Sequence, residues 1–243
     1  MPENTSTEFK DKYHPIYERG ANSMIFRNYL RYIYQSSFSL LKEKGWNSFA
    51  KEKPNVLLCG VGSSTTANEF AHFVAKNTSQ ASLNILDFSD HPLEKSKAKL
   101  AEKAEDLKNL SINFIRGNAL QIPLADGTID HIETDCFIQF FTPEQRGLLI
   151  KEWLRVLKPG GTITTREFIK RDTPVSKILY DINSKLMARL LGVRIHDMTP
   201  QNLEDLFKNN QLDSHVSAAK IPFTGLHYPA FRFVTARKHP ASS

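Results

Sequence analysis

The sequence lacks several features that define large classes of protein. It contains no run of about 18 apolar residues, so we expect no membrane span. Its first residues, MPENTSTE, include neither a basic nor an apolar segment, so we expect no secretory signal. Only two cysteines occur in 243 residues, and their spacing is not that of metal ligands. We therefore expect a cytoplasmic protein with no metal site and no disulfide framework.

The positive charge of the chain is concentrated in its two flanks. Residues 169–243 contain eleven Lys and Arg against six Asp and Glu, and residues 1–53 contain nine against six. Residues 54–168 contain twelve against fourteen. No run of basic residues or RNA-binding motif accompanies this excess, which disfavours nucleic acid as a partner. The basic flanks indicate either an ordinary solvated surface or a surface that faces an anionic substrate or an acidic partner.

Hydrophobic periodicity predicts alternating strands and helices. Strands are expected at 56–59, 83–86, 112–115, 129–134, 162–168, 215–221 and 230–236, and helices at 22–44, 65–76, 92–107, 143–157, 175–191 and 200–209. The segment Lys158–Gly161 (KPGG) is expected to end the helix before it. This alternation predicts an α/β fold in which helices cover both faces of a parallel sheet.

One predicted strand has an unusual composition. His131 and Glu133 lie within 129–134, where a buried strand should be apolar. Either the two side chains pair with each other, or this strand is less covered than its neighbours.

The first candidate ligand site lies between the first strand and the following helix. The segment Leu58–Thr65 (LCGVGSST) places Gly60 and Gly62 in this turn, where small residues let the backbone approach a ligand closely. Asp87 ends the second strand, at the distance expected for a residue that accepts hydrogen bonds from ribose hydroxyls. A dinucleotide fingerprint requires a third glycine where Thr65 stands, which counts against NAD.

Four segments together resemble the class I S-adenosylmethionine-dependent methyltransferases, and most of all the small-molecule branch that includes quinone-biosynthesis enzymes. They are VLLCGVGSS at 56–64, ILDFS at 85–89, RGNA at 116–119 with IPLADGTID at 122–130, and LRVLKPGG at 154–161. The resemblance covers about residues 54–168. It implies a Rossmann-like, seven-stranded, mostly parallel sheet that ends in an antiparallel hairpin. The pattern along the chain predicts a helical arm at 1–53 and a domain at 54–243 with a helical segment inserted at about 172–210, which would form a lid in this architecture.

The resemblance also implies S-adenosylmethionine as cofactor and a set of residues to bind it. These residues are Gly60, Gly62, Ser63, Asp87, Phe88, Asn118, Ala119 and Thr134. Asp87 would accept both ribose hydroxyls, and Phe88 would lie against adenine. Asn118 replaces the more common Asp, and Ser64 replaces a third glycine.

The sequence assigns no catalytic residue. The candidates for a base are Tyr13, His14, Tyr17, Asp135, Glu167, His196 and His227. Cys136 has no neighbouring His in the sequence to activate it as a nucleophile. Asp135–Ile138 (DCFI) stands where nucleobase methyltransferases have Asn-Pro-Pro-Tyr or Pro-Cys, which argues against methylation of a base.

We therefore expect methyl transfer to a small molecule that is anionic or partly apolar. The candidates to line its pocket are Leu186, Met187, Leu190, Leu191 and Phe223, together with the aromatic-rich N-terminal arm. The alternatives are a protein or RNA methyltransferase and a non-catalytic cofactor-binding module. The sequence predicts no oligomeric state.

Overall fold

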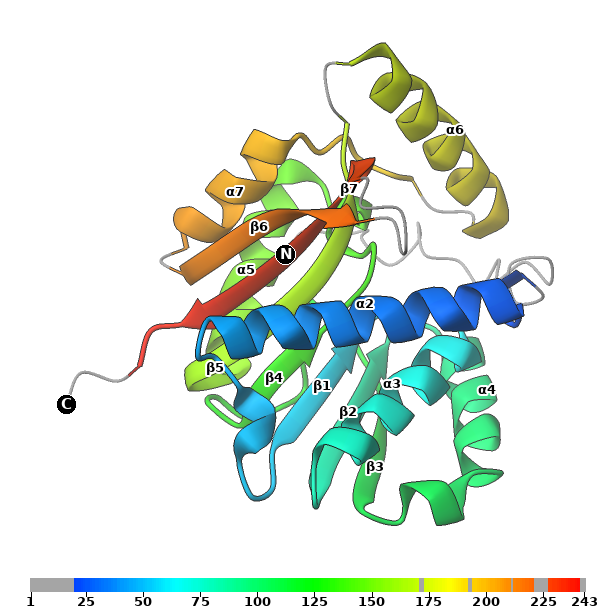
Figure 1. The fold of residues 1–243 in the computed structure, drawn as a ribbon, viewed down its shortest axis with the longest axis vertical. Helices are drawn as coiled ribbons and strands as arrows, with labels where there is room; N and C mark the ends of the chain where they lie inside the picture. Colours follow the sequence, from blue (N-terminus) through cyan, green and yellow to red (C-terminus); the bar gives the residue numbers. More distant parts are fainter. Residues whose placement is uncertain (1–19, 171–172, 192–193, 211, 221–226, 241–243) are drawn as a thin grey trace.

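The computed structural model describes residues 20–170, 173–191, 194–210, 212–220 and 227–240. The chain forms one seven-stranded sheet with the strand order β3-β2-β1-β4-β5-β7-β6 (Figure 1). β7 runs antiparallel to both β5 and β6, and the other neighbouring strands are parallel. The expected Rossmann-like fold with a final antiparallel hairpin is confirmed.

The elements follow the predicted order. The strands are β1 (Asn55–Cys59), β2 (Ala81–Asp87), β3 (Leu110–Arg116), β4 (Ile129–Glu133), β5 (Leu157–Phe168), β6 (Leu212–Lys220) and β7 (His227–Lys238). The helices are α2 (Met24–Glu43), α3 (Ser64–Asn77), α4 (Asp90–Ala101), α5 (Pro143–Val156), α6 (Pro174–Leu191) and α7 (Pro200–Lys208). Three short 3-10 helices are η1 (Ser48–Ala50), η2 (Ala104–Leu107) and η3 (Ile138–Phe140).

Several element boundaries differ from the prediction by a few residues, and two of these differences change an element's extent most. The helix expected at 92–107 ends at Ala101, and the short helix η2 follows it. η2 places the buried side chain of Leu107 in the core. The segment Lys158–Gly161 belongs to β5 instead of separating it from α5. Between the pairs Ile129–Leu157 and His131–Thr162 the register shifts, and Gly160 has a φ of 74° there. A glycine accommodates this bulge because it has no Cβ to clash in the left-handed region.

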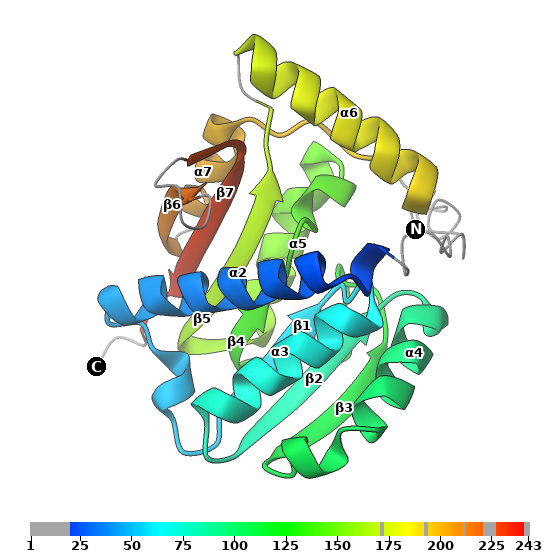
Figure 2. The same cartoon turned by 45° about the vertical axis from the view of Figure 1, so that its right-hand side comes forward.

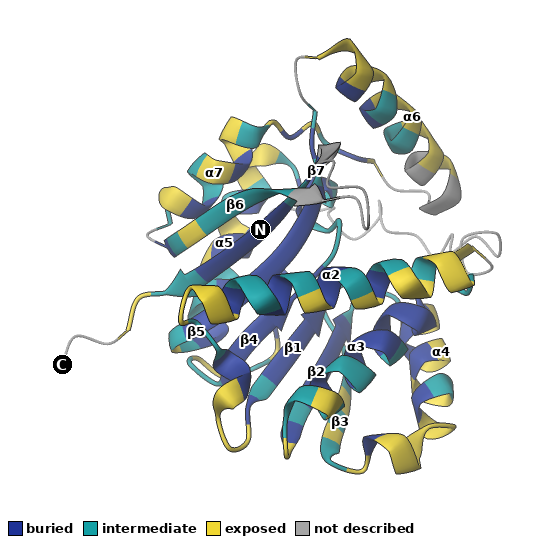
Figure 3. Ribbon diagram, in the orientation of Figure 1, coloured by how far each residue is buried: buried dark blue, intermediate teal, exposed yellow. Residues whose placement is uncertain are grey.

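Alternate residues of the strands face two separate hydrophobic cores. One core joins α2, α3 and α4 to one face of the sheet through side chains such as Val56, Leu58 and Ile85. The other joins α5 and α7 to the opposite face through Leu57, Ile132 and Ile163. The central strands are therefore buried on both sides (Figure 3), which explains their continuous apolar sequences.

α2 crosses the sheet as a packed layer (Figure 2). Leu30, Ile33 and Leu41 are each at most 1% exposed and share a core with Phe70 of α3. Ser23 caps the helix by accepting a hydrogen bond from the backbone N–H of Phe26. The division of the chain between residues 53 and 54 stays a prediction, although α2 is integrated into the domain core. Among the described helices, none combines the length and the hydrophobicity needed to traverse a lipid bilayer.

Candidate functional site

The predicted cofactor residues gather at the carboxyl edge of the sheet. The turn that contains Gly60 and Gly62 follows β1, Asp87 is the last residue of β2, and Thr134 follows β4. Asn118 and Ala119 come shortly after the end of β3. Because these four strands are parallel neighbours, their ends meet at one edge, where open α/β sheets bind ligands.

The carboxylate of Asp87 is directed at the glycine turn. Its Oδ2 accepts hydrogen bonds from the backbone N–H groups of Val61 at 2.9 Å and Gly62 at 3.4 Å. Its Oδ1 accepts one from the N–H of Ser89 at 2.9 Å. Burial raises the pKa of Asp87, and these backbone hydrogen bonds oppose the rise. The acid at the end of β2 therefore fixes the shape of the turn, a role that the sequence analysis missed.

Phe137 covers the turn from the end of β4. Gly60 has a φ of 76°, and a Cβ at this position would lie 2.4 Å from the ring of Phe137. The ring packs in turn against Phe141, with ring centroids 5.1 Å apart. Gly60 is therefore needed both for its backbone conformation and for the close approach of an aromatic ring.

We expect Gly60→Ala to destabilise the protein by about 2–5 kcal/mol. The left-handed conformation costs about 1–2 kcal/mol in a non-glycine residue, and displacing the packed ring adds about 1–3 kcal/mol. Gly127→Ala is the matched control, because Gly127 has a φ of 60° but nothing within 4 Å of its Cβ position. Urea unfolding measures both variants. Equal losses would show that the Phe137 contact contributes nothing.

Thr65, which stands where a dinucleotide fingerprint has its third glycine, has a structural role. Thr65 is buried, and its hydroxyl donates to Oδ1 of Asn22 at 2.6 Å and accepts from Nζ of Lys99 at 3.1 Å. The side chain of Ser63 caps α3 by accepting from the N–H of Thr66. Thr65 thus ties the start of α3 to α4 and to the segment before α2, which explains why a larger residue stands there.

The remaining predicted cofactor residues differ in exposure. Phe88 is 37% exposed, and Ala119 is buried. Oδ1 of the exposed Asn118 accepts from the N–H of Leu120 at 2.9 Å. A ligand contact through that oxygen would be its second hydrogen bond. The Oγ1 atom of Thr134 is buried and has no hydrogen-bond partner among the described residues. The assignment of these four residues to the cofactor stays a prediction.

A chain of buried polar side chains runs between β4 and β5, beneath α2. Oγ1 of Thr162 contacts Oγ of Ser48 and Nδ1 of His131, both at 2.8 Å. Oγ1 of Thr164 lies 3.1 Å from Nε2 of His131 and donates to Glu133. β4 and β5 thus each carry a polar residue at every second position, and these residues lie on the same face of the sheet. His131 and Glu133 do lie close together, but the hydroxyls of β5 complete their environment.

Arg166 connects this chain of polar side chains to the carboxyl edge of the sheet. It is fully buried, forms an ion pair with Glu133, and has its Nε 3.3 Å from Oδ1 of Asp135. The Nη2 atom of Arg166 faces Glu133, and its Nη1 atom donates to Oγ of Ser37 on α2 at 3.3 Å. Although burial disfavours the charge of Glu133, Arg166 and His131 hold the pKa of Glu133 below its ordinary value. One cation therefore serves two carboxylates.

Asp135 lies at the open end of this chain, with 16% of its side chain exposed. Burial raises its pKa to about 6, Arg166 opposes the rise, and Glu133 adds to it. The hydroxyl of Tyr29 on α2 also opposes the rise in the pKa of Asp135. A carboxylate with a pKa near neutrality, beside a ligand site, can accept a proton at physiological pH.

The backbone is strained immediately after Asp135. Cys136 has a φ of 51°, the only positive φ of a non-glycine residue among those described. Burial raises the pKa of its thiol well above the ordinary value, which agrees with the expectation that Cys136 is not a nucleophile. Strained conformations of this kind cluster at functional sites. Here the strain turns the chain from β4 toward Phe137.

Glu167 stabilises that turn from the opposite face of β5. Its Oε1 accepts from the N–H groups of Phe137 at 3.3 Å and Ile138 at 3.2 Å. Burial raises the pKa of Glu167 to about 7, and the hydrogen bonds oppose the rise. Because the side chain is 0% exposed, Glu167 positions η3 and does not face the ligand edge.

Of the candidate bases other than Asp135 and Glu167, only His196 has a described side chain. Tyr13, His14 and Tyr17 fall outside the described residues, as do Phe223 and the side chain of His227. His196 lies in the segment before α7, where its N–H donates to the carbonyl of Gln139 at 2.8 Å. Of the seven candidates, the structure places Asp135 beside the predicted cofactor residues.

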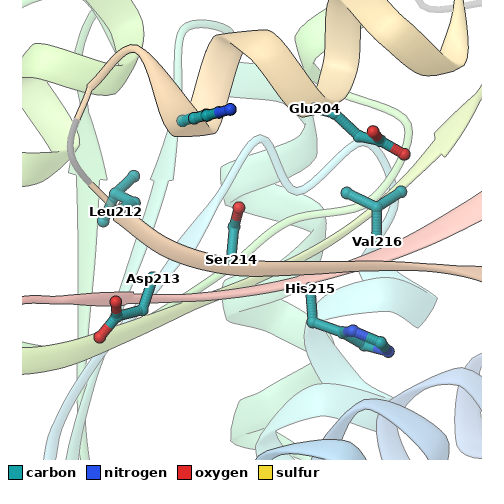
Figure 4. Close-up of a pocket in the computed structure, with 7 residues that line it drawn as sticks. Glu204, Leu212, Asp213, Ser214, His215 and Val216 are labelled. Atoms are coloured by element: carbon teal, nitrogen blue, oxygen red, sulfur yellow. The ribbon is translucent and has the colours of Figure 1, made fainter.

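A separate groove of about 410 Å³ lies between α7 and the edge strand β6 (Figure 4). It is lined by Glu204, Lys208, Leu212, Asp213, Ser214, His215 and Val216. None of the predicted cofactor residues lines it. The groove therefore does not belong to the site at the carboxyl edge.

Residues 36–201 match the model of the ubiE/COQ5 methyltransferase family. The chain is 37% identical over 107 residues to a demethylmenaquinone methyltransferase of Lactococcus lactis, covering 44% of this chain and 40% of that protein. It is 31% identical over 168 residues to one of Shouchella clausii, covering 66% and 67%. The match therefore spans less than half of the Lactococcus relative and about two thirds of the Shouchella relative.

Solved structures share the fold. A S-adenosylmethionine-dependent methyltransferase from Methanosarcina mazei superposes with a TM-score of 0.58 at 19% identity, covering 79% of this chain and 95% of that one. One from Aquifex aeolicus superposes with a TM-score of 0.51 at 16% identity, covering 83% and 88%. At these identities the likeness concerns the fold alone.

Proposed function

Since the chain belongs to the ubiE/COQ5 methyltransferase family, we propose that it transfers a methyl group from S-adenosylmethionine to a small quinone-type acceptor. One observation carries the proposal. A glycine turn held by Asp87 and the partly exposed carboxylate of Asp135 lie at the same edge of the sheet. The turn suits a nucleoside cofactor, and the carboxylate suits an acceptor that must lose a proton.

The residues at the edge fit S-adenosylmethionine by their chemistry. Asp87 already accepts three backbone hydrogen bonds, and a carboxylate has about four lone-pair sites, so capacity remains for a ribose hydroxyl. Phe88 offers an exposed ring beside it for adenine. The hydroxyl of Thr134, which has no hydrogen-bond partner in the described part of the chain, would offer a further polar contact. When bound, the cofactor supplies an electrophilic methyl group.

Asp135 is the proposed proton acceptor. A hydroquinone hydroxyl, or the ring carbon activated by it, becomes a better nucleophile when its proton is removed. Asp135 would take that proton, and Arg166 would keep the carboxylate oriented through its contact at 3.3 Å. Tyr29 would hold the same carboxylate from α2. Asp135 follows the end of β4, Arg166 belongs to β5 and Tyr29 belongs to α2, so the domain core fixes the position of the base.

The acceptor class follows from the relatives. Those from Lactococcus and Shouchella are demethylmenaquinone methyltransferases, and we extend a quinone-type acceptor to this chain as part of the proposal. Incubating the protein with S-adenosylmethionine and a panel of reduced quinones, catechols, peptides and RNA tests it. We expect S-adenosylhomocysteine and a methylated product in equal amounts with a reduced quinone. Methylation of the peptides or the RNA but of no quinone would contradict the proposal. Cofactor binding without methylation of any acceptor in the panel would contradict it too.

Asp87→Ala should weaken the binding of S-adenosylhomocysteine by roughly 10–150-fold. The substitution removes charged acceptor atoms, and hydrogen bonds to a charged group contribute about 1.5–3 kcal/mol, where 1.4 kcal/mol is about tenfold. Asp106→Ala is the control, because Asp106 has 64% of its side chain exposed and belongs to η2. Calorimetric titration gives both dissociation constants. An unchanged constant for Asp87→Ala would refute the ribose assignment.

A further inference from the structure

α6 carries a stripe of exposed apolar side chains. Val175, Ile178, Ile182 and Leu186 are 61%, 59%, 59% and 47% exposed. Their spacing of three and four residues places them on one face of the helix. Figure 3 shows α6 largely exposed along its outward side. A contiguous apolar stripe on a surface helix indicates an interaction site more often than chance exposure does.

The opposite face of α6 fixes the helix to the domain. Tyr180 is 1% exposed, and its ring lies 6.2 Å from that of Phe168 at the end of β5. Its hydroxyl donates to the carbonyl oxygen of His196 at 3.2 Å. Ser176, one turn earlier, is also buried. Since these contacts anchor one face, the apolar stripe points away from the core.

The charges on α6 indicate what the stripe contacts. Lys177, Lys185 and Arg189 are exposed on this helix, and Asp181 is its one acidic residue. By helical spacing, Lys185 and Arg189 border the apolar stripe in its C-terminal half, whereas Lys177 lies on another face. A basic amphipathic helix with a broad apolar face is typical of a segment that lies in a membrane interface.

A second exposed apolar group lies near the same end of the molecule. Met24 and Ile25, in the first turn of α2, are 76% and 84% exposed. Figures 1 and 2 both show the first turn of α2 and the C-terminal end of α6 on the same side. One flat surface could therefore contact both groups.

We propose that α6 lies on a bilayer containing anionic phospholipids, with its apolar stripe between the headgroups. Lys185 and Arg189 then face the anionic headgroups, and Met24 and Ile25 provide a second contact. α6 follows the carboxyl end of β5, so the edge that holds Asp87 and Asp135 lies on the membrane side. The inference goes beyond the proposed methyl transfer and does not depend on it.

Vesicle co-sedimentation tests the proposal with the whole chain. We expect binding to phosphatidylcholine vesicles containing about 30 mol% phosphatidylglycerol to exceed binding to pure phosphatidylcholine by about tenfold or more, and to weaken with salt. Ile178→Glu/Ile182→Glu should lower that binding by about tenfold or more. The matched control is Leu148→Glu, because Leu148 is a 54% exposed leucine on α5. Its binding should stay within about twofold of the parent.

Variants that remove positive charge separate the electrostatic contribution to vesicle binding from the apolar one. Lys185→Gln/Arg189→Gln should lose the preference for anionic vesicles, whereas the exposed pair Lys95→Gln/Lys97→Gln on α4 should keep it. Absent vesicle binding by the parent, or equal losses in the control variants, would overturn the proposal. So would a dimer in sedimentation velocity that Ile178→Glu/Ile182→Glu dissociates. In the absence of vesicles, all variants should bind S-adenosylhomocysteine like the parent. A failure of the vesicle test would therefore leave the methyltransferase proposal standing.

Discussion

Asp135→Asn should lower turnover by about 10²–10⁴-fold, the range by which a positioned base accelerates a reaction. The amide keeps the shape of the carboxylate but cannot take a proton. The affinity for S-adenosylhomocysteine should stay within about twofold, because the acid is assigned to the acceptor and not to the cofactor. Steady-state kinetics and calorimetry measure the two quantities. Full turnover in Asp135→Asn would exclude Asp135 as the base.

The pH profile provides a second readout of the same group. Burial raises the pKa of Asp135 to about 6, and the base acts only when ionised. The groups that face it are Arg166 and Glu133 from the sheet and Tyr29 from α2. In the parent, kcat/KM should rise with pH through about 6 and then level off, and the residual activity of Asp135→Asn should lack this step. Asp126→Asn, with 78% of its side chain exposed in the parent, should keep it.

Arg166→Met should destabilise the fold by about 3–5 kcal/mol, the cost of leaving one partner of a buried ion pair uncompensated. Glu133 would keep its charge in a site that is 2% exposed, without its guanidinium. Adding Glu133→Leu should restore part of the loss, because the more deeply buried of the two carboxylates that Arg166 serves is then absent. Urea unfolding measures both variants.

The control for this variant is Arg237→Met at a partly exposed ion pair. Arg237 and Asp213 have 29% and 36% of their side chains exposed, so the loss should be below about 1 kcal/mol. The lowered pKa of Glu133 adds a pH signature. The stability it provides is complete above the ordinary carboxyl pKa and is lost as pH falls through the lowered value. A loss in Arg166→Met no larger than that in Arg237→Met would contradict the buried pair.

The sequence predicts the sheet well because its information is local. The apolar run of β1, the capped start of α5 at Thr142 and the Gly60 turn each depend on neighbouring residues. The same is true of Asp87, which ends a strand that is recognisable by itself. Parallel strands then place these ends at one edge without further information.

What the sequence could not show depends on pairing across the sheet. His131 and Glu133 look anomalous along β4, and only the register with Thr162 and Thr164 reveals their partners. The choice of Asp135 among seven candidate bases likewise depends on Arg166, which lies 31 residues away. A polar side chain at every second position of both strands was the available signal.

Two further features, the position of Phe137 and the exposed face of α6, depend on tertiary packing that the sequence does not show. The fit of the Phe137 ring over Gly60 follows from the strained backbone at Cys136, which has no sequence signature. The periodicity of α6 reveals an apolar face but not whether that face is buried. The structure buries Tyr180 and exposes Ile182 and Leu186. Leu186, which is predicted to line a substrate pocket, points outward instead, and the side chains of Met187, Leu190 and Leu191 lie outside the described residues.

Calorimetric titration of the parent protein with S-adenosylhomocysteine and, separately, with NAD tests the central claim most directly. We predict saturable binding of S-adenosylhomocysteine at one site per chain and no binding of NAD, because Thr65 replaces the third glycine that a dinucleotide requires. The bound ligand should also raise the unfolding temperature, since it binds only the folded state. Binding of NAD in place of S-adenosylhomocysteine, or of neither ligand, would contradict the assignment of this edge as a methyltransferase site.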